Sequence, residues 1–196
     1  MRIIGIDPGK TIGLCVYDTD ARRVLKAACV VSAQEALQWV RAEYRIDDDG
    51  MTPVAIERPR IYQSAGNELC DTIEQTGWLV GMLGGEYPPH PKAPGVYVCP
   101  PNMAHDCEVY LLERRAVVGA LSAAMGQTVK GDAGVWQALK ALHPDAMRRP
   151  VGYKPATRKR PAVAPVEGGP LYGVTSHAQQ AVAVAWALAR HLGAQP

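Results

Sequence analysis

The sequence predicts an α/β protein built on a mixed five-stranded sheet with helices on both faces. Two observations support this fold class. Three apolar runs at the amino terminus are separated by short turns, which is typical of an antiparallel meander. After them, runs of strand and helix character alternate, which is typical of strands joined by helices. With 196 residues, the chain is expected to form a single domain, residues 1–196.

The first two strands cover residues 2–7 and 12–18 and are joined by a Pro-Gly turn. This pair favours a turn because proline fixes φ and glycine accepts a positive φ. Residues 23–31 form the third strand. Asp7 ends the first strand among residues that should be buried, where a lone carboxylate is costly unless it is paired or binds a metal. Asp7 is therefore either a turn residue or part of an ion site.

The remaining elements follow from hydrophobic periodicity and capping signals, such as Ser32 with Glu35 three residues later. The predicted helices are residues 33–44, 67–85, 102–125, 131–142 and 176–191, and the further strands are residues 53–57 and 96–99. Residues 144–172 hold six prolines and six Lys or Arg residues without periodicity. We therefore expect a mobile basic loop there.

Composition limits the classes of function. The formal net charge of +2 conceals an asymmetry, because residues 1–110 are net −5 and residues 111–196 net +7. A basic half beside an acidic half favours a polyanionic partner. The five cysteines are scattered without metal-binding spacing, no apolar run is long enough to span a membrane, and the chain begins directly with a strand. We expect a cytoplasmic protein without a membrane partner.

Four polar side chains are candidates for a common site. Asp7 and Glu57 each end a predicted strand, and His177 and Gln180 lie one turn apart at the start of the last helix. If the strand of residues 53–57 lies parallel to the first strand, both carboxylates meet at one edge of the sheet. Such a site suits Mg²⁺, with Mn²⁺ as a substitute. Two such ions can clamp the attacking and leaving oxygens of a phosphodiester.

Three segments carry a resemblance to a known family. They are Ile4-Gly-Ile-Asp-Pro-Gly9 with Thr11-Ile-Gly13, then Ala55-Ile-Glu-Arg-Pro59, then Ser176-His-Ala-Gln-Gln-Ala-Val-Ala-Val-Ala185. In this order and at these separations, the chain resembles RuvC-type Holliday junction resolvases of the ribonuclease-H-like superfamily. The resemblance covers most of the chain. It implies a homodimeric, Mg²⁺-dependent endodeoxyribonuclease that nicks branched DNA such as four-way junctions.

The resemblance also implies which residues hold the metal. The family uses Asp, Glu, then Asp or His, then Asp, and these positions correspond to Asp7, Glu57, His177 and Gln180. The first three are the expected metal ligands, and all four are expected catalytic residues. The fourth position departs from the pattern, because an amide carries no charge. Either His177 and Asp7 keep one metal and Gln180 is an outer-sphere or substrate ligand, or the protein has reduced activity or binds junctions without cutting them.

Several other residues are expected to contact DNA. They are Lys10, Tyr62, Gln63, Lys130, Arg158, Lys159 and Arg160. Basic side chains in the loop before the last helix would bind phosphates in a salt-sensitive way. Asp132 is expected to be the N-cap of its helix. The other functions left open are a YqgF-like RNA-processing nuclease and an actin-like ATPase, although 196 residues leave no room for the second domain of such an ATPase.

Overall fold

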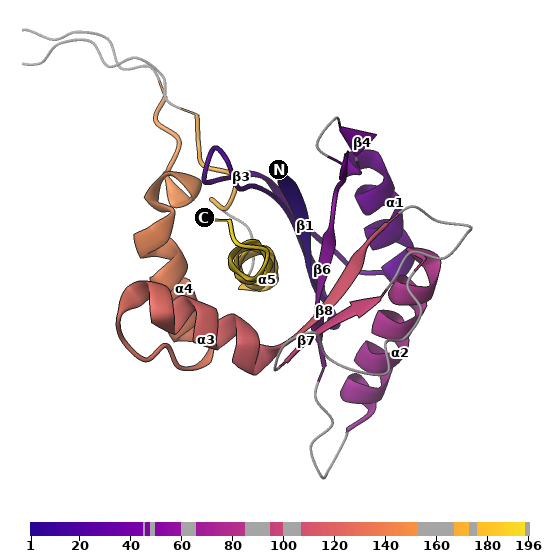
Figure 1. Cartoon of the computed structure of the whole chain (residues 1–196). Helices are drawn as coiled ribbons and strands as arrows, with labels where there is room; N and C mark the ends of the chain where they lie inside the picture. Colours follow the sequence, from indigo (N-terminus) through magenta and orange to yellow (C-terminus); the bar gives the residue numbers. More distant parts are fainter. Residues whose placement is uncertain are drawn as a thin grey trace, which may run out of the picture.

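Six strands form one sheet, and helices cover both of its faces (Figure 1). The computed structural model describes residues 1–44, 46–47, 50–59, 66–84, 95–99, 107–152, 167–172 and 176–194. The strands of this sheet are β1 (Arg2–Asp7), β2 (Ile12–Asp18), β3 (Arg23–Val30), β6 (Val54–Arg58), β7 (Val96–Cys99) and β8 (Val109–Glu113), in the order β3-β2-β1-β6-β8-β7. The predicted fold class is confirmed.

The pairing of β1 with β6 determines where the two predicted strand-end acids lie. The two strands are parallel, with Ile4 opposite Val54 and Ile6 opposite Ile56. On its other side β1 pairs antiparallel with β2, and β2 pairs antiparallel with β3, as the predicted meander requires. The carboxyl ends of β1 and β6 therefore lie side by side, as expected from the sequence.

The strand β8 corrects one prediction. Residues 102–125 were expected to be helical, but residues 109–113 form a strand parallel to β6, with Arg58 opposite Glu113. The run Val-Tyr-Leu-Leu is apolar throughout, which fits a strand buried on both faces as well as a helix. The predicted strand at residues 96–99 is β7, which pairs antiparallel with β8 at the edge of the sheet. The sheet thus has six strands rather than five.

Two layers of helices enclose the sheet. The helices are α1 (Ala33–Glu43), α2 (Asn67–Met82), α3 (Arg114–Met125), α4 (Gly131–Leu142) and α5 (Ser176–His191). Figure 1 shows α1 and α2 on one face and α5 end-on against the other face, with α3 and α4 beyond it. The start of α1 has the predicted cap, because Ser32 Oγ accepts a hydrogen bond of 3.2 Å from the Glu35 backbone. The Glu35 carboxylate accepts a bond from the Val31 backbone in turn.

Helix α5 is the central packing element. Eleven of its 16 residues are buried, so it is apolar on all sides, as a helix enclosed between two layers must be. Glycines in the sheet permit its close approach. A Cβ atom at Gly13 would lie 2.0 Å from the His177 carbonyl oxygen, and one at Gly5 would lie 2.1 Å from that of Ala181. These contacts fix the amino-terminal turn of α5 against β2, next to the end of β1.

The second core lies under α1 and α2. It consists of side chains from the opposite face of the sheet, among them Ile4, Ile6 and Leu14, packed against Val40 and Leu79. Because neighbouring residues of a strand point to opposite faces, β1 contributes Ile3 to one core and Ile4 to the other. The central strands β1 and β2 and most of β6 are therefore buried on both faces, whereas the edge strand β3 is partly exposed.

The segment 144–172 is ordered at both of its ends. Residues Pro144–Met147 form a short 3₁₀-helix, η1, and Leu171 is buried. The two ends are held together by backbone hydrogen bonds from Gly169 to Arg148 and from Leu171 to Ala146, both 2.8 Å long. The middle, residues 153–166, lies outside the described residues, so a mobile loop there stays a prediction.

Two smaller features complete the description. A second, two-stranded sheet pairs β4 (Ile46–Asp47) with β5 (Gly50–Met51) in an antiparallel ladder. Among the described residues, no helix has the length and apolar character that crossing a bilayer requires.

Candidate active site at the carboxyl ends of β1 and β6

Asp7 is the innermost acid of the site. It is the last residue of β1, lies opposite Gly13 of β2 and is only 9% exposed. Its Oδ2 accepts a hydrogen bond from Nδ1 of His177, with 2.9 Å between the two atoms. Burial raises the pKa of Asp7, and the hydrogen bond and charge of His177 oppose that rise. Asp7 is thus a buried carboxylate with one ionisable partner, as an ion site would require.

Glu57 lies beside Asp7 on the neighbouring strand. It is the penultimate residue of β6, and its carboxylate is largely buried. Burial raises the pKa of Glu57 to about 7, because the attraction of Arg114 is too weak to offset desolvation and the negative charge of Asp7 adds to it. The two strand-end acids therefore influence each other, as the predicted parallel pairing implied.

His177 reaches the site from α5. It lies in the first turn of the helix, and its side chain is 40% exposed. The hydrogen bond to Asp7 raises the pKa of His177, while partial burial lowers it. Since Nδ1 is held by Asp7, the other ring nitrogen, Nε2, is the one available to a ligand or substrate. The structure thus brings three of the predicted residues, Asp7, Glu57 and His177, to one edge of the sheet.

Gln180 also lies at the site, but its partner was not foreseen. Its side chain is buried, with 6% exposure, and Oε1 accepts a hydrogen bond of 2.5 Å from Nη1 of Arg114. The same Nη1 atom lies 3.1 Å from Oε2 of Glu57. Arg114 is the first residue of α3, directly after β8. The guanidinium therefore lies between the neutral amide and one of the two buried carboxylates.

Asp132 is a further acid at this edge, and here a prediction is wrong. Lys130, not Asp132, occupies the N-cap position of α4, and no side chain caps the helix. Asp132 lies in the first turn, 79% exposed, and its carboxylate accepts a bond from Nη2 of Arg114. Its charge is close enough to raise the pKa values of Asp7, Glu57 and His177. A tertiary contact, rather than a cap, determines its position.

A separate group of side chains lies next to the site at the end of β8. Glu113 accepts a hydrogen bond of 2.9 Å from the Tyr97 hydroxyl. It also forms an ion pair with Arg115, with 2.7 Å between its Oε2 and Nε of Arg115. The guanidinium of Arg58 stacks over the Tyr97 ring, 4.6 Å from its centroid. Glu113 is thus paired with residues outside the set that Arg114 joins. Sequence reasoning missed Arg114 and assigned Asp132 only as an N-cap, and a strand ending in Glu-Arg at 113–114 was the available signal.

The chemistry of the donors fits a hard divalent cation. Asp7 and Glu57 offer carboxylate oxygens and His177 an imidazole nitrogen, which are ligand types that Mg²⁺ and Mn²⁺ accept. Burial raises the pKa of both carboxyl groups, so added positive charge would stabilise their ionised forms. Within the described part of the chain, however, no three such side chains already converge as a metal cluster, and Arg114 bridges Glu57 to Asp132.

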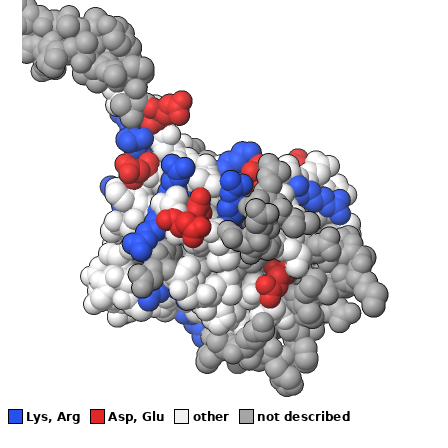
Figure 2. All heavy atoms as spheres, turned by 45° about the horizontal axis from the view of Figure 1, so that its top comes forward, with Lys and Arg blue, Asp and Glu red and all other residues white. Residues whose placement is uncertain are grey.

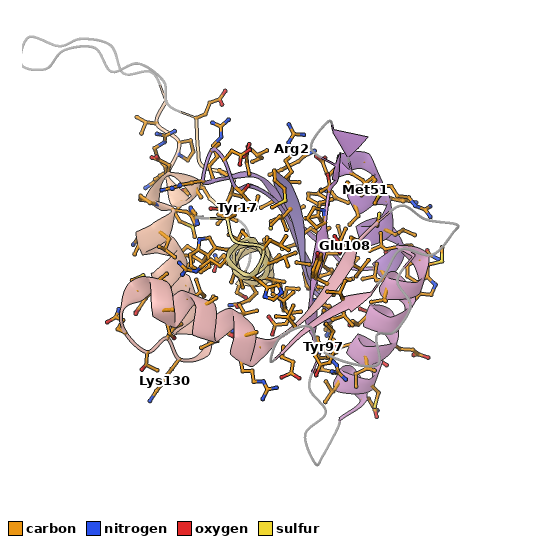
Figure 3. The ribbon with its side chains drawn as sticks, viewed as in Figure 1. Arg2, Tyr17, Met51, Tyr97, Glu108 and Lys130 are labelled. Atoms are coloured by element: carbon orange, nitrogen blue, oxygen red, sulfur yellow. The ribbon has the colours of Figure 1, made fainter. Side chains whose placement is uncertain are left out.

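The predicted DNA contacts are only partly placed. Lys130 is exposed and, in Figure 3, points outward at the same end of the molecule as Tyr97, opposite Arg2. Lys10 lines a cavity of about 370 Å³ together with Glu68 and Asp71 of α2, so it has acidic neighbours. Tyr62, Gln63 and residues 158–160 lie outside the described residues.

At the end of the molecule away from the candidate site, the distribution of charged side chains does not indicate a DNA-binding face. Figure 2 turns the end that carries the amino terminus of β1 forward, and there Lys and Arg side chains are interspersed with Asp and Glu. Lys130 instead lies beside the site, because Asp132, two residues on, is joined through Arg114 to Glu57. Among the described basic residues, Arg114 contacts the acids directly, and Lys130 is an exposed lysine at the start of α4, two residues before Asp132.

Comparison with solved structures identifies the fold. The architecture is ribonuclease-H-like, and one similar structure is that of T. thermophilus RuvC in complex with a Holliday junction substrate. The alignment covers 99% of this chain and 98% of that chain, with a TM-score of 0.53 and 16% sequence identity. Models of protein families and curated protein sequences give no match. The predicted resemblance to RuvC-type resolvases is thus confirmed at the level of the fold.

Proposed function

We propose that the protein is a metal-dependent, structure-selective endonuclease that cleaves Holliday junctions or related branched DNA by phosphodiester hydrolysis. The observation that carries this proposal is the meeting of Asp7 and Glu57 at adjacent strand ends, with His177 hydrogen-bonded to Asp7 across 170 residues of sequence. The RuvC-like fold and the basic second half of the chain support it.

In this proposal Asp7, Glu57 and His177 would hold Mg²⁺ or Mn²⁺. The bound metal would supply Lewis-acid stabilisation of charge on the phosphodiester oxygens. Asp7 fixes the His177 ring through Nδ1, which leaves Nε2 either to bind the metal or to orient and deprotonate the attacking water. Arg114 adds a fixed positive charge next to Glu57 and Gln180.

The DNA would be held through its phosphates. Lys130 is an exposed residue at the start of α4, two positions before Asp132, and Lys10 follows Asp7 in the turn between β1 and β2. Tyr62, Gln63, Arg158, Lys159 and Arg160 remain proposed contacts. We further propose a homodimer acting in the cytoplasm, with one site for each of the two symmetric nicks.

A second candidate function is junction binding with weak or no cleavage. It is favoured by the contact between Gln180 and Arg114, since Gln180 stands where the resolvase pattern has an acid. This candidate shares the fold, the basic residues and the expected preference for branched DNA, and it differs only in the chemistry.

The two candidates are separated by one experiment. Synthetic four-way junctions and linear duplexes of the same sequence are incubated with the protein in Mg²⁺, Mn²⁺ or EDTA. Junction-selective nicking that requires a metal supports the endonuclease. Tight junction binding without nicking in either metal supports the binding protein, and equal nicking of the linear duplex contradicts structure selectivity.

A further inference from the structure

Arg114 has an unusual set of partners for a side chain at a strand-to-helix junction. Its Nη1 lies 3.1 Å from Oε2 of Glu57 and 2.5 Å from Oε1 of Gln180, and its Nη2 donates to Asp132. The guanidinium side chain is 25% exposed. A planar fork with several fixed donors can hold three acceptors at once, which a lysine ammonium on its flexible stem would do less well.

Arg114 is the fixed positive charge among the acids of the site. Asp7, Glu57 and Asp132 supply up to three negative charges, and Arg114 is paired with two of these acids. Gln180 accepts a hydrogen bond from the guanidinium but adds no charge. An aspartate at position 180 would bring a further carboxylate to the same place. The pair of Arg114 and Gln180 therefore puts a fixed cation and a neutral acceptor where an additional acid could have helped to hold a second ion.

We propose that Arg114 takes the place of a second metal ion, so that the site binds one divalent cation, held by Asp7, Glu57 and His177. This inference rests on the proposed nuclease function, because it assigns the second positive charge of that chemistry to a side chain. A guanidinium can stabilise charge on a transferring phosphoryl group without dissociating from the protein. Arg114 is then a catalytic residue, and Gln180 is the residue that positions it.

If Arg114 had a purely structural role, its removal would change metal affinity and DNA cleavage differently. If the side chain only tied α3 to β6 and α4, its loss would weaken metal binding, DNA cleavage and stability together. If it acts as a resident cation, its removal leaves Glu57 and Asp132 unpaired, and these charges attract metal more strongly. Metal affinity then rises while cleavage falls, and the two readouts move in opposite directions.

The experiment counts Mn²⁺ ions and measures their affinity. Mn²⁺ positions per chain are counted by anomalous scattering from crystals grown with Mn²⁺, and the dissociation constant is obtained from the EPR signal of free Mn²⁺. The variants are Arg114→Met, Arg114→Lys and the double variant Arg114→Met/Gln180→Asp. Arg115→Met is the matched control, since Arg115 pairs with Glu113 outside the site.

The inference predicts one Mn²⁺ in the wild-type protein and two in the double variant. Arg114→Met should bind its Mn²⁺ about tenfold more tightly, because a unit charge a few ångströms away is removed, and should nick junctions at least about 100-fold more slowly. Arg114→Lys, which keeps the charge and guards against a folding defect in the methionine variant, should bind Mn²⁺ within about threefold of wild type. Arg115→Met should match wild type in both readouts.

Four results would contradict a single metal ion with Arg114 as the second positive charge. Two Mn²⁺ ions in the wild-type protein, no bound Mn²⁺ at all, an unchanged or weaker affinity in Arg114→Met, or an Arg114→Lys variant that binds like Arg114→Met would overturn the inference. Its failure can be told apart from that of the proposed function. Junction nicking with two metals removes the inference alone. One bound Mn²⁺ without nicking of any DNA removes the nuclease function and, with it, the catalytic role of Arg114, while the one-metal stoichiometry stands.

Discussion

The Nδ1 atom of His177 lies 2.9 Å from Oδ2 of Asp7, although the two residues are 170 positions apart in the sequence. Asp7 ends the first strand and His177 lies in the first turn of the last described helix, so the contact joins the two at the edge of the sheet that carries the candidate site. It exists because Gly13 lets the backbone of His177 approach β2. The same close packing of α5 on β2 therefore also positions His177 beside Asp7.

We expect the stability of the metal-free protein to depend on the protonation of Glu57. Burial raises its pKa from 4.5 to about 7, so the folded state holds this proton more tightly than the unfolded state. The stabilisation is complete below pH 4.5 and is lost as the pH rises through about 7. Between pH 4.5 and 8, the free energy of unfolding of the wild type should fall relative to that of Glu57→Gln by up to about 3 kcal/mol.

This difference is measured by urea unfolding of both proteins in EDTA across the pH range. Comparing the two proteins cancels the titration of other groups, such as His143, whose pKa burial lowers. Parallel curves for wild type and Glu57→Gln would show that Glu57 has an ordinary pKa and is not desolvated at the strand end.

The close approach of α5 to β2 makes Gly13 a position where a methyl group is not tolerated. A Cβ atom there would lie 2.0 Å from the His177 carbonyl oxygen and 2.7 Å from the Ala178 nitrogen, and both are backbone atoms. We expect Gly13→Ala to lower the free energy of unfolding by about 3 kcal/mol or more, measured by chemical denaturation. It should also move His177 away from Asp7, which weakens Mn²⁺ binding.

Gly119→Ala provides the control for this substitution. Gly119 lies inside α3, and nothing lies within 4 Å of the position of its Cβ. Alanine should stabilise the helix there by up to about 1 kcal/mol. Equal and small effects of the two substitutions would mean that α5 does not pack on β2 as described.

Lys130 should contribute to DNA binding through a phosphate. Lys130→Ala is expected to weaken binding of four-way junctions and of duplexes alike, and to reduce the slope of log K against log salt by about 1. Lys140→Ala is the matched variant, since Lys140 is an exposed lysine in the last turn of the same helix, away from the acids. Fluorescence anisotropy at several salt concentrations measures both slopes, and an identical slope for the two variants would exclude a phosphate contact at Lys130.

The sequence predicts those parts of the fold and of the candidate site that depend on local hydrophobic and turn patterns. The strand-turn-strand around Asp7, the parallel strand that presents Glu57 and the helix that presents His177 all follow from hydrophobic runs and turn residues, and the structure places them as expected. In each case the candidate residue stands at the end of an element that its hydrophobic pattern and its flanking turn or capping residues define.

The remaining part of the site could not be predicted because it depends on tertiary contacts. The strand β8 is a short apolar run that passes into α3 without an intervening turn, so strand and helix could not be told apart. Arg114 lies at that junction, and its partners Glu57, Asp132 and Gln180 are 57, 18 and 66 positions away. No local signal connects them, and a helix-start acid such as Asp132 is then easily taken for a cap.

In the proposed function, Asp7 anchors a metal site that cleaves branched DNA. The most direct test of this function is the rate at which wild type and Asp7→Asn nick a synthetic four-way junction in Mg²⁺, with junction affinity measured for both proteins in EDTA. We predict Mg²⁺-dependent nicking by the wild type, a loss of at least about 100-fold in Asp7→Asn, and unchanged junction affinity. Nicking by Asp7→Asn at the wild-type rate, or nicking by the wild type that persists in EDTA, would contradict it.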